Sequence, residues 1–232
     1  MSQSTLKTSL VAVLVALCGA AQANPVVFSS VGGAPSGANR WNLDATVEPS
    51  GTILTTITPN AGFVTGSATG QYAAPFLSGS NGAGFGAGGS NQAGGQDQTQ
   101  YLTTGSTGAT PAARIQFAFN APQLYFGLLW GSVDLYNSIA FFNGDDSVGT
   151  LTGADASPAA TGNQGVEGTR YVNINFDKSY NRVVFTSSQF AFEFDNVAWA
   201  STRQGVPEPA TLALVGAALL GFGAVRARRS TR

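Results

Sequence analysis

Residues 171–176, Tyr-Val-Asn-Ile-Asn-Phe, decide the fold. In this stretch Val172, Ile174 and Phe176 alternate with asparagines. Successive side chains of a strand point to opposite faces, so the three apolar residues share one face and the asparagines share the other. The stretch therefore predicts a β-strand with one buried face, which is typical of an antiparallel sheet.

Residues 190–195, Phe-Ala-Phe-Glu-Phe-Asp, repeat this pattern farther along the chain. The three phenylalanines fall on one face, and we expect them to point into the core. Glu193 and Asp195 fall on the opposite face, which we expect to be in contact with water. Apolar residues continue beyond this stretch, so the predicted strand spans 190–200.

Further short β-rich runs are separated by Gly, Asn, Asp, Ser and Pro. They predict strands at 26–29, 52–58, 113–119, 124–129, 138–142 and 182–186. Residues 143–146, Asn-Gly-Asp-Asp, lie between two apolar runs and predict a hairpin turn. The sequence thus predicts an all-β domain, namely an antiparallel β-sandwich of the jelly-roll kind.

We expect the β-sandwich domain to span residues 24–205 and to contain a Gly-rich loop at 78–95. Such a loop cannot bury enough apolar surface to offset its chain entropy, and we expect it to be flexible. It is not a phosphate-binding loop, because no P-loop lysine follows it. The flanking segments, 1–23 and 206–232, each combine an apolar run with basic residues and are predicted to be targeting segments.

The composition excludes several kinds of chemistry. Of the 232 residues, none is His and one is Cys. The sequence therefore offers no Ser-His-Asp triad, no His-ligated zinc and no intrachain disulfide. A formal net charge of −1 argues against nucleic acid as a partner, because phosphate binding needs a basic surface.

The first 23 residues predict a secretory signal peptide. The apolar run 10–17 is too short to span a bilayer but fits the hydrophobic region of a signal peptide. Ala21 and Ala23 form a small-x-small cleavage site for signal peptidase. The alternative is a lipoprotein signal with Cys18 acylated, although Leu17 is bulkier than the residue that such a signal needs there.

The C-terminal segment predicts a single transmembrane helix over residues 210–225. These residues would form a helix about 24 Å long, close to the thickness of a membrane's hydrocarbon core. Arg226, Arg228 and Arg229 follow this run and would stay on the cytoplasmic side as a stop-transfer cluster. The alternative interpretation of this segment is a plain membrane tail anchor.

Pro-Glu-Pro, a short apolar helix and an Arg cluster, in this order over residues 206–232, resemble the PEP-CTERM sorting signal. The resemblance implies transient insertion in the inner membrane and processing by an exosortase, a membrane transpeptidase-like protease. The prolines would hold the motif extended. The motif residues are Val206, Pro207, Glu208 and Pro209.

A second resemblance covers residues 100–200. The stretches 125–144, 171–176 and 192–198 look like those of a group of exosortase-dependent surface proteins whose mature domain is a jelly-roll sandwich. The last stretch, Phe-Glu-Phe-Asp-Asn-Val-Ala, more loosely resembles a strand of carbohydrate-binding modules. The resemblance implies a jelly-roll fold and leaves the ligand open.

Aromatic side chains are the first candidates for a binding site, because sugar rings stack on Trp and Tyr faces. Trp130, Tyr136 and Trp199 would form a platform, with Asp134 and Asn137 hydrogen-bonding to sugar hydroxyls. The alternative is that the tryptophans pack in the core and that Asp134 and Asn137 close a turn.

Carboxylates are the remaining candidates for chemistry. A glycosidase-like acid and base would come from Asp134, Asp145, Asp146, Glu193 and Asp195. Most of these residues are expected to lie in turns or on solvent-exposed faces of strands, so we expect no catalysis. Asp195 and Asn196 are instead the first expected ligands of a structural Ca²⁺, since hard cations bind oxygen atoms.

These features together predict a non-enzymatic exported protein. It would be anchored in the membrane before processing and then sorted by an exosortase to the cell surface or extracellular matrix, where it associates with exopolysaccharide. The alternatives are a carbohydrate-binding module with a defined glycan ligand and a secreted hydrolase.

Overall fold

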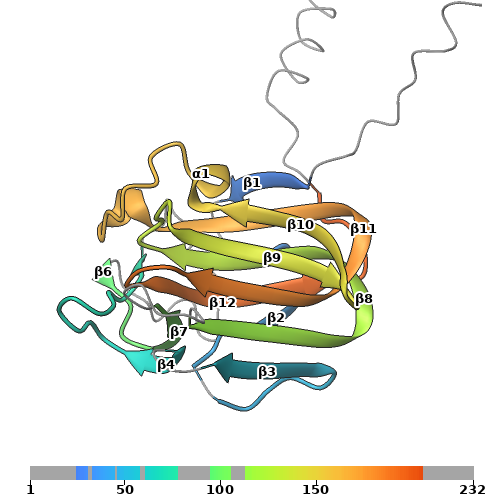
Figure 1. Ribbon diagram of the computed structural model, residues 1–232, viewed down its shortest axis with the longest axis horizontal. Helices are drawn as coiled ribbons and strands as arrows, with labels where there is room; N and C mark the ends of the chain where they lie inside the picture. The colour runs from blue at the N-terminus through green and yellow to red at the C-terminus, as the bar shows by residue number, and fades with distance from the viewer. Residues whose placement is uncertain are drawn as a thin grey trace, which may run out of the picture.

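Figure 1 shows the computed structural model, which describes residues 25–30, 33–44, 46–57, 61–77, 95–105 and 113–205. The predicted signal peptide at 1–23, nearly all of the Gly-rich loop and the segment 206–232 with its predicted helix at 210–225 lie outside the described residues. Among the residues that are described, no helix has the length and apolar character needed to cross a membrane.

Antiparallel β-sheet makes up nearly all of the regular structure in these ranges. Within the described residues, helix is confined to α1 (Gly153–Ala156) and a 3-10 turn at Val166–Gly168. The strands are β1 (Val26–Ser30), β2 (Asn39–Trp41), β3 (Thr52–Ile57), β4 (Ala61–Thr65), β5 (Phe76–Leu77), β6 (Gly95–Gln96), β7 (Gln100–Thr104), β8 (Arg114–Gly131), β9 (Asn137–Asn143), β10 (Asp146–Thr152), β11 (Arg170–Ser187) and β12 (Phe192–Ala200).

The strands β8 and β11, of 18 residues each, pair with each other along two separate stretches. Residues 170–175 of β11 pair with 125–130 of β8, and residues 182–186 pair with 114–118. Between these stretches the register shifts, around the exposed residues 120–122 of β8. Pro122 has no N–H to donate to a ladder, which favours a bend at this point. Both strands therefore pass from one layer of the fold into a second layer.

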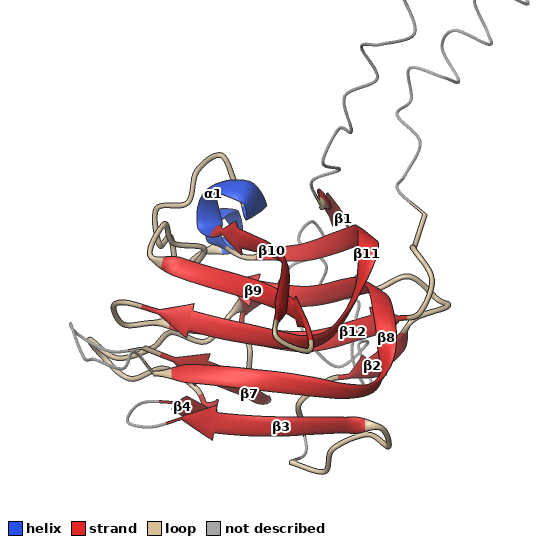
Figure 2. Ribbon diagram, turned by 45° about the vertical axis from the view of Figure 1, so that its right-hand side comes forward, coloured by secondary structure: helices blue, strands red, loops and turns tan. Residues whose placement is uncertain are grey.

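The strands, which Figure 2 shows in a turned view, divide between two layers whose facing side chains are in contact. The first layer contains β1, the beginning of β11, the end of β8, then β12 with β2 and β7 beside it, and β4. The second contains β10, β9, the end of β11, the beginning of β8, and β3. The predicted all-β, antiparallel class is thus confirmed.

Two pairs of predicted strands are continuous in the structure. The runs predicted as 113–119 and 124–129 are both parts of β8, and 171–176 and 182–186 are both parts of β11. The polar breaks between these runs are bends and not strand ends, because pairing resumes in the other layer. The hairpin predicted at 143–146 is present, with Asp146 paired to Asn143 and Gly144 at a φ of 60°.

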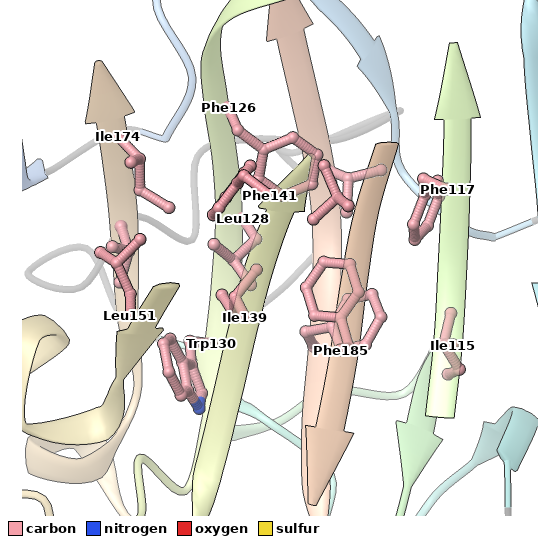
Figure 3. Close-up of a cluster of buried hydrophobic side chains, with 14 of the residues drawn as sticks. Ile115, Phe117, Phe126, Leu128, Trp130, Ile139, Phe141, Leu151, Ile174 and Phe185 are labelled. Atoms are coloured by element: carbon pink, nitrogen blue, oxygen red, sulfur yellow. The ribbon is translucent and has the colours of Figure 1, made fainter. Parts of the chain in front are cut away.

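Aromatic rings fill the space between the layers (Figure 3). Phe185 of the second layer stacks on Phe194 of the first, with ring centroids 4.1 Å apart. Phe117 meets Phe185 edge-on at 5.7 Å, and Phe126 meets Phe141 edge-on at 5.8 Å. Such tilted and edge-on ring pairs add to the stabilisation that burial provides.

The outer face of the first layer is also covered. A second, smaller cluster there contains Ala34, Leu77, Tyr125, Leu129, Tyr171, Ala198 and Ala200. The prediction that Glu193 and Asp195 face water is therefore wrong, since they are 2% and 0% exposed. Their strand lies between β8 and β7, and the chain before β5 crosses over Glu193. Two of the three phenylalanines predicted to point inward, Phe192 and Phe194, are buried.

Phe117→Ala is expected to lower the free energy of unfolding by about 3–5 kcal/mol, because it removes a fully buried ring and leaves a cavity. Urea denaturation followed by tryptophan fluorescence measures this change. Ile53→Ala on the neighbouring strand β3 is the control, since its side chain is 54% exposed and its loss should change stability by only about 0.5 kcal/mol. Equal losses in the two variants would contradict the placement of the core.

Candidate functional site

A cavity of about 570 Å³ lies beside the first residues of β12. Its walls come from residues 67–73, from the turn after β8, from residues 161–164 and from residues 190–193. Its volume is within the range of small-molecule sites. Several of the residues that line the cavity have side chains able to form hydrogen bonds, namely Tyr72, Asp134, Tyr136, Thr161, Gln164 and Glu193.

Asp134 is held in the cavity wall by the loop that contains residues 161 and 162. Asp134 forms an isolated β-bridge with Thr161, and the Gly162 N–H donates to the Val133 carbonyl at 3.0 Å. Gly162 has a φ of 69°, and a Cβ atom at this position would collide with the Asp134 carboxylate. Glycine at 162 therefore permits the close approach that places this carboxylate in the wall.

Glu193 reaches the same cavity from β12. One carboxylate oxygen accepts a hydrogen bond from the Ala73 N–H at 2.8 Å, whereas the other oxygen, Oε2, has no donor among the described residues. The pKa of Glu193 is raised to about 8, chiefly by burial and to a smaller extent by the nearby charge of Asp134, against the lowering effect of the hydrogen bond from Ala73. At neutral pH the carboxyl group is therefore largely protonated and can donate a hydrogen bond to a bound molecule.

Tyr136 lines the cavity next to Asp134. Its hydroxyl donates to the Phe190 carbonyl at 3.0 Å, and burial raises its pKa above the usual range, so that it stays protonated. Burial also raises the pKa of Asp134, while the neighbouring Tyr136 hydroxyl lowers it. These groups form a polar wall with both donors and acceptors, which suits a ligand rich in hydroxyl groups.

The structure places Trp130, predicted as a sugar-stacking residue, in the core. Its ring is fully buried and stacks on Phe192 with centroids 4.5 Å apart, so neither face is open to a ligand. Asn137 is also fully buried; it donates to the Ala191 carbonyl and accepts from the Ser187 hydroxyl. Trp199 is only 5% exposed and packs against Phe119. Of the predicted platform, only Tyr136 and Asp134 line the cavity.

The other predicted acids lie away from this cavity. Asp145 is fully exposed in the β9–β10 turn, where its carboxylate is 3.8 Å from the Arg182 guanidinium, and Asp146 begins β10. Asp195 and Asn196, the predicted Ca²⁺ ligands, are buried in the middle of β12 and do not line the cavity. In the described part of the chain, no three His, Cys, Asp or Glu side chains are grouped so as to hold a metal ion.

Sequence patterns missed part of the cavity wall. Tyr72 and residues 161–164 come from loops without a motif, and nothing in the sequence places these loops beside β12. Strand alternation assigns Glu193 to a solvent-exposed face, so the sequence pattern argues against a role for it in a site. Its position between three phenylalanines was the available signal, since an acid inside a strongly apolar strand is unusual.

Comparison with protein families adds a finding at the C-terminus. The model of the PEP-CTERM protein-sorting motif matches residues 205–229. The chain carries a PEP-CTERM sorting motif. This PEP-CTERM motif agrees with the resemblance seen at 206–232, and it implies export, a C-terminus anchored in the membrane before processing, and an exosortase as the processing partner. The matched residues after 205 lie outside the described structure.

Among solved structures, the chain is similar to the catalytic domain of a GH87 α-1,3-glucanase variant in complex with nigerose. The sequence identity is 13% and the TM-score is 0.39; the match covers 77% of this chain and 31% of that one. It is also similar to a family 43 arabinoxylan arabinofuranohydrolase from Bacillus subtilis, with 17% identity and a TM-score of 0.31 over 48% of this chain and 23% of that one. The chain thus spans about a third or less of these proteins, and likenesses this distant assign no function. No curated protein matches the chain.

Glu193→Gln is expected to change how stability depends on pH. The pKa of Glu193 is about 8 in the folded chain and about 4.5 in the unfolded chain. Protonation of this group therefore stabilises the folded state fully below pH 4.5, and this stabilisation is lost as the pH rises through 8. Glutamine does not titrate, so the variant should lose less stability between pH 5 and pH 9, by about 4 kcal/mol at most. Urea denaturation across this range measures the effect.

The control for this prediction is Glu167→Gln, which changes an acid on the surface. Its pH profile should follow that of the unmodified protein. A Glu193→Gln profile that also follows the unmodified protein would contradict the burial of this carboxyl group.

Proposed function

We propose that the protein is a non-enzymatic component of the cell surface or extracellular matrix, sorted and processed by an exosortase. The PEP-CTERM motif at 205–229 carries this proposal. The signal peptide at 1–23 would direct export, residues 210–225 would hold the precursor in the membrane, and the arginines after them would stop its transfer. The β-domain would then be displayed outside the cell in association with exopolysaccharide.

We further propose that the two layers form a β-sandwich of the jelly-roll type. Support comes from the antiparallel pairing throughout, and from the two long strands β8 and β11, which pass together from one layer into the other. A fold of this kind presents its loops at the ends of the layers, where the cavity walls are built.

The second candidate function is a carbohydrate-binding module. The cavity supports it, because its wall combines the Tyr136 ring and hydroxyl with the carboxyl groups of Asp134 and Glu193. A sugar offers both apolar ring faces and hydroxyl groups, so a wall of this composition is complementary to it.

The third function, glycoside hydrolysis, has less support from the same carboxyl groups. Hydrolysis needs one carboxylic acid and one carboxylate, whose pKa values their environments push apart. Here burial raises the pKa values of both Asp134 and Glu193. Two groups driven toward the neutral form suit hydrogen bonding to a ligand better than acid–base catalysis.

Substitution of the sorting motif tests the first function. Glu208→Ala is expected to block processing, so that the protein keeps the arginine cluster and stays with the membrane fraction. Mass spectrometry of the C-terminal peptide, in cells that contain an exosortase, measures the outcome. Glu48→Ala in the exposed loop before β3 is the control and should be processed normally. Detection of Arg226 and Arg228 on exported, unmodified protein would contradict exosortase processing.

Binding to glycans tests the second function. The exported protein should be retained by exopolysaccharide or by members of a glycan array, and Tyr136→Ala should weaken this retention at least about tenfold by removing the ring and hydroxyl from the cavity wall. Leu135→Ala is the matched control, since its side chain is 65% exposed and does not line the cavity. Absence of binding by the unmodified protein would exclude the module and leave the sorting proposal intact.

A further inference from the structure

The cavity beside β12 is lined by acidic side chains without a basic one. Asp134 and Glu193 both line it, whereas no Lys or Arg is among the described residues that do. The sequence also has no Lys or Arg between Arg40 and Arg114, a stretch that includes the cavity segment 67–73. An anionic ligand would therefore meet no positive partner here, while a cationic ligand would meet two carboxyl groups.

Glu193 offers this cavity an oxygen atom that the chain itself does not use. Its side chain is only 2% exposed, and the Ala73 N–H donates to one carboxyl oxygen. The other oxygen, Oε2, is buried without a partner among the described residues. Leaving a buried polar atom unpartnered is unfavourable, so a ligand that donates to Oε2 would gain from relieving this cost.

Ser132 provides a second unpartnered group in the same wall. It is 5% exposed, and its hydroxyl oxygen has no hydrogen-bond partner in the described part of the chain. Glu193 pairs directly with Gly131, the last residue of β8, so Ser132 and Asp134 follow within three residues of its partner in the ladder. The pairing of β8 with β12 thus brings two carboxyl groups and a hydroxyl group to one side of the cavity.

The size and remaining walls of the cavity indicate what else the ligand contains. A volume of about 570 Å³ is far larger than a single ammonium group, so the cation would be part of a larger molecule. Tyr72 and Tyr136 also line the cavity, and aromatic rings of this kind pack against the apolar faces of sugar rings. This step rests on the carbohydrate-binding module proposed above.

We propose that the cavity binds a saccharide with a free amino group, whose ammonium group is accepted by Glu193, Asp134 and Ser132. An ammonium group has three N–H donors and a positive charge, which complements two carboxylates and a hydroxyl oxygen. Burial favours the neutral form of both carboxyl groups, and the bound cation would counteract this, because an opposite charge favours the ionised form. Acetylation of the amino group would remove both the charge and two of the donors.

Three tetrasaccharides with the same β-1,4 linkage test this ligand class. They are built from glucosamine, N-acetylglucosamine and glucose, so they differ only in the group that replaces one hydroxyl. Isothermal titration calorimetry with the exported protein at pH 6, where the amino groups carry charge, measures their affinities. The glucosamine tetramer should bind at least about tenfold more tightly than either of the others, because only it forms charge-assisted hydrogen bonds with the carboxylates.

Variants of the two acids locate the preference. Glu193→Gln and Asp134→Asn should each reduce the preference for the glucosamine tetramer at least about threefold. Glu167→Gln is the matched control, since it removes an exposed acid that does not line the cavity, and it should keep the full preference. Circular dichroism checks folding, and if one of the two variants does not fold, the other decides. Full preference in every folded variant of these two acids overturns the proposal.

The remaining outcomes separate this proposal from the carbohydrate-binding module. Equal affinities for the three tetramers would overturn the preference for an amino group and leave the module intact. Absence of binding by the glucosamine tetramer would also overturn it, and the module would fall with it only if the glycan array is negative as well. A tetralysine peptide that binds as tightly as the glucosamine tetramer would overturn the assignment to a saccharide.

Discussion

The pairing of β8 with β11 is the constraint on which the rest of the structure depends. These two strands pair with each other in both layers, so the ladder between them joins the layers as well as the strands. β1 and β9 attach to β11, while β3 and β12 attach to β8. The remaining strands of the large sheet are added to β9, β12 or β7. A bend in two adjacent strands thus defines the position of the whole core.

β12 shows how this arrangement produces the candidate site. Its inner row contains Phe192 and Phe194, which stack on aromatic rings of other strands. Its outer row contains Glu193 and Asp195, which would be in water if the first layer had one open face. Because other parts of the chain cover that outer face, both acids are buried, and Glu193 borders the cavity. The candidate site therefore arises beside a strand with two buried faces.

The sequence was sufficient for the fold class and for several strands, because alternation and turn residues are local signals. The hairpin at 143–146 is an example, since Asn and Gly determine a tight turn whatever surrounds it. The continuity of β8 and β11 was not predictable in this way. A polar break such as residues 120–122 looks the same whether a strand ends there or bends into another layer.

The candidate site was less accessible to sequence reasoning than the fold. Trp130 and Asn137 are residue types that bind sugars, but their burial depends on partners such as Phe192 and Ser187. The prediction that Glu193 and Asp195 lie on a solvent-exposed face was wrong for the same reason. Alternation defines the two faces of a strand, whereas the chain elsewhere decides whether each face meets water.

The enclosed acids oppose the stability of the domain. Apolar residues at 193 and 195 would be compatible with burial, and replacing buried charges in this way is often neutral or stabilising. The sequence has no cysteine after residue 18, so no disulfide within the domain offsets the acids. Packing alone therefore does not account for them, and departures of this kind are expected at functional sites. The two acids differ in their surroundings. Glu193 borders a cavity large enough for a solute, whereas Asp195 is fully buried away from that cavity.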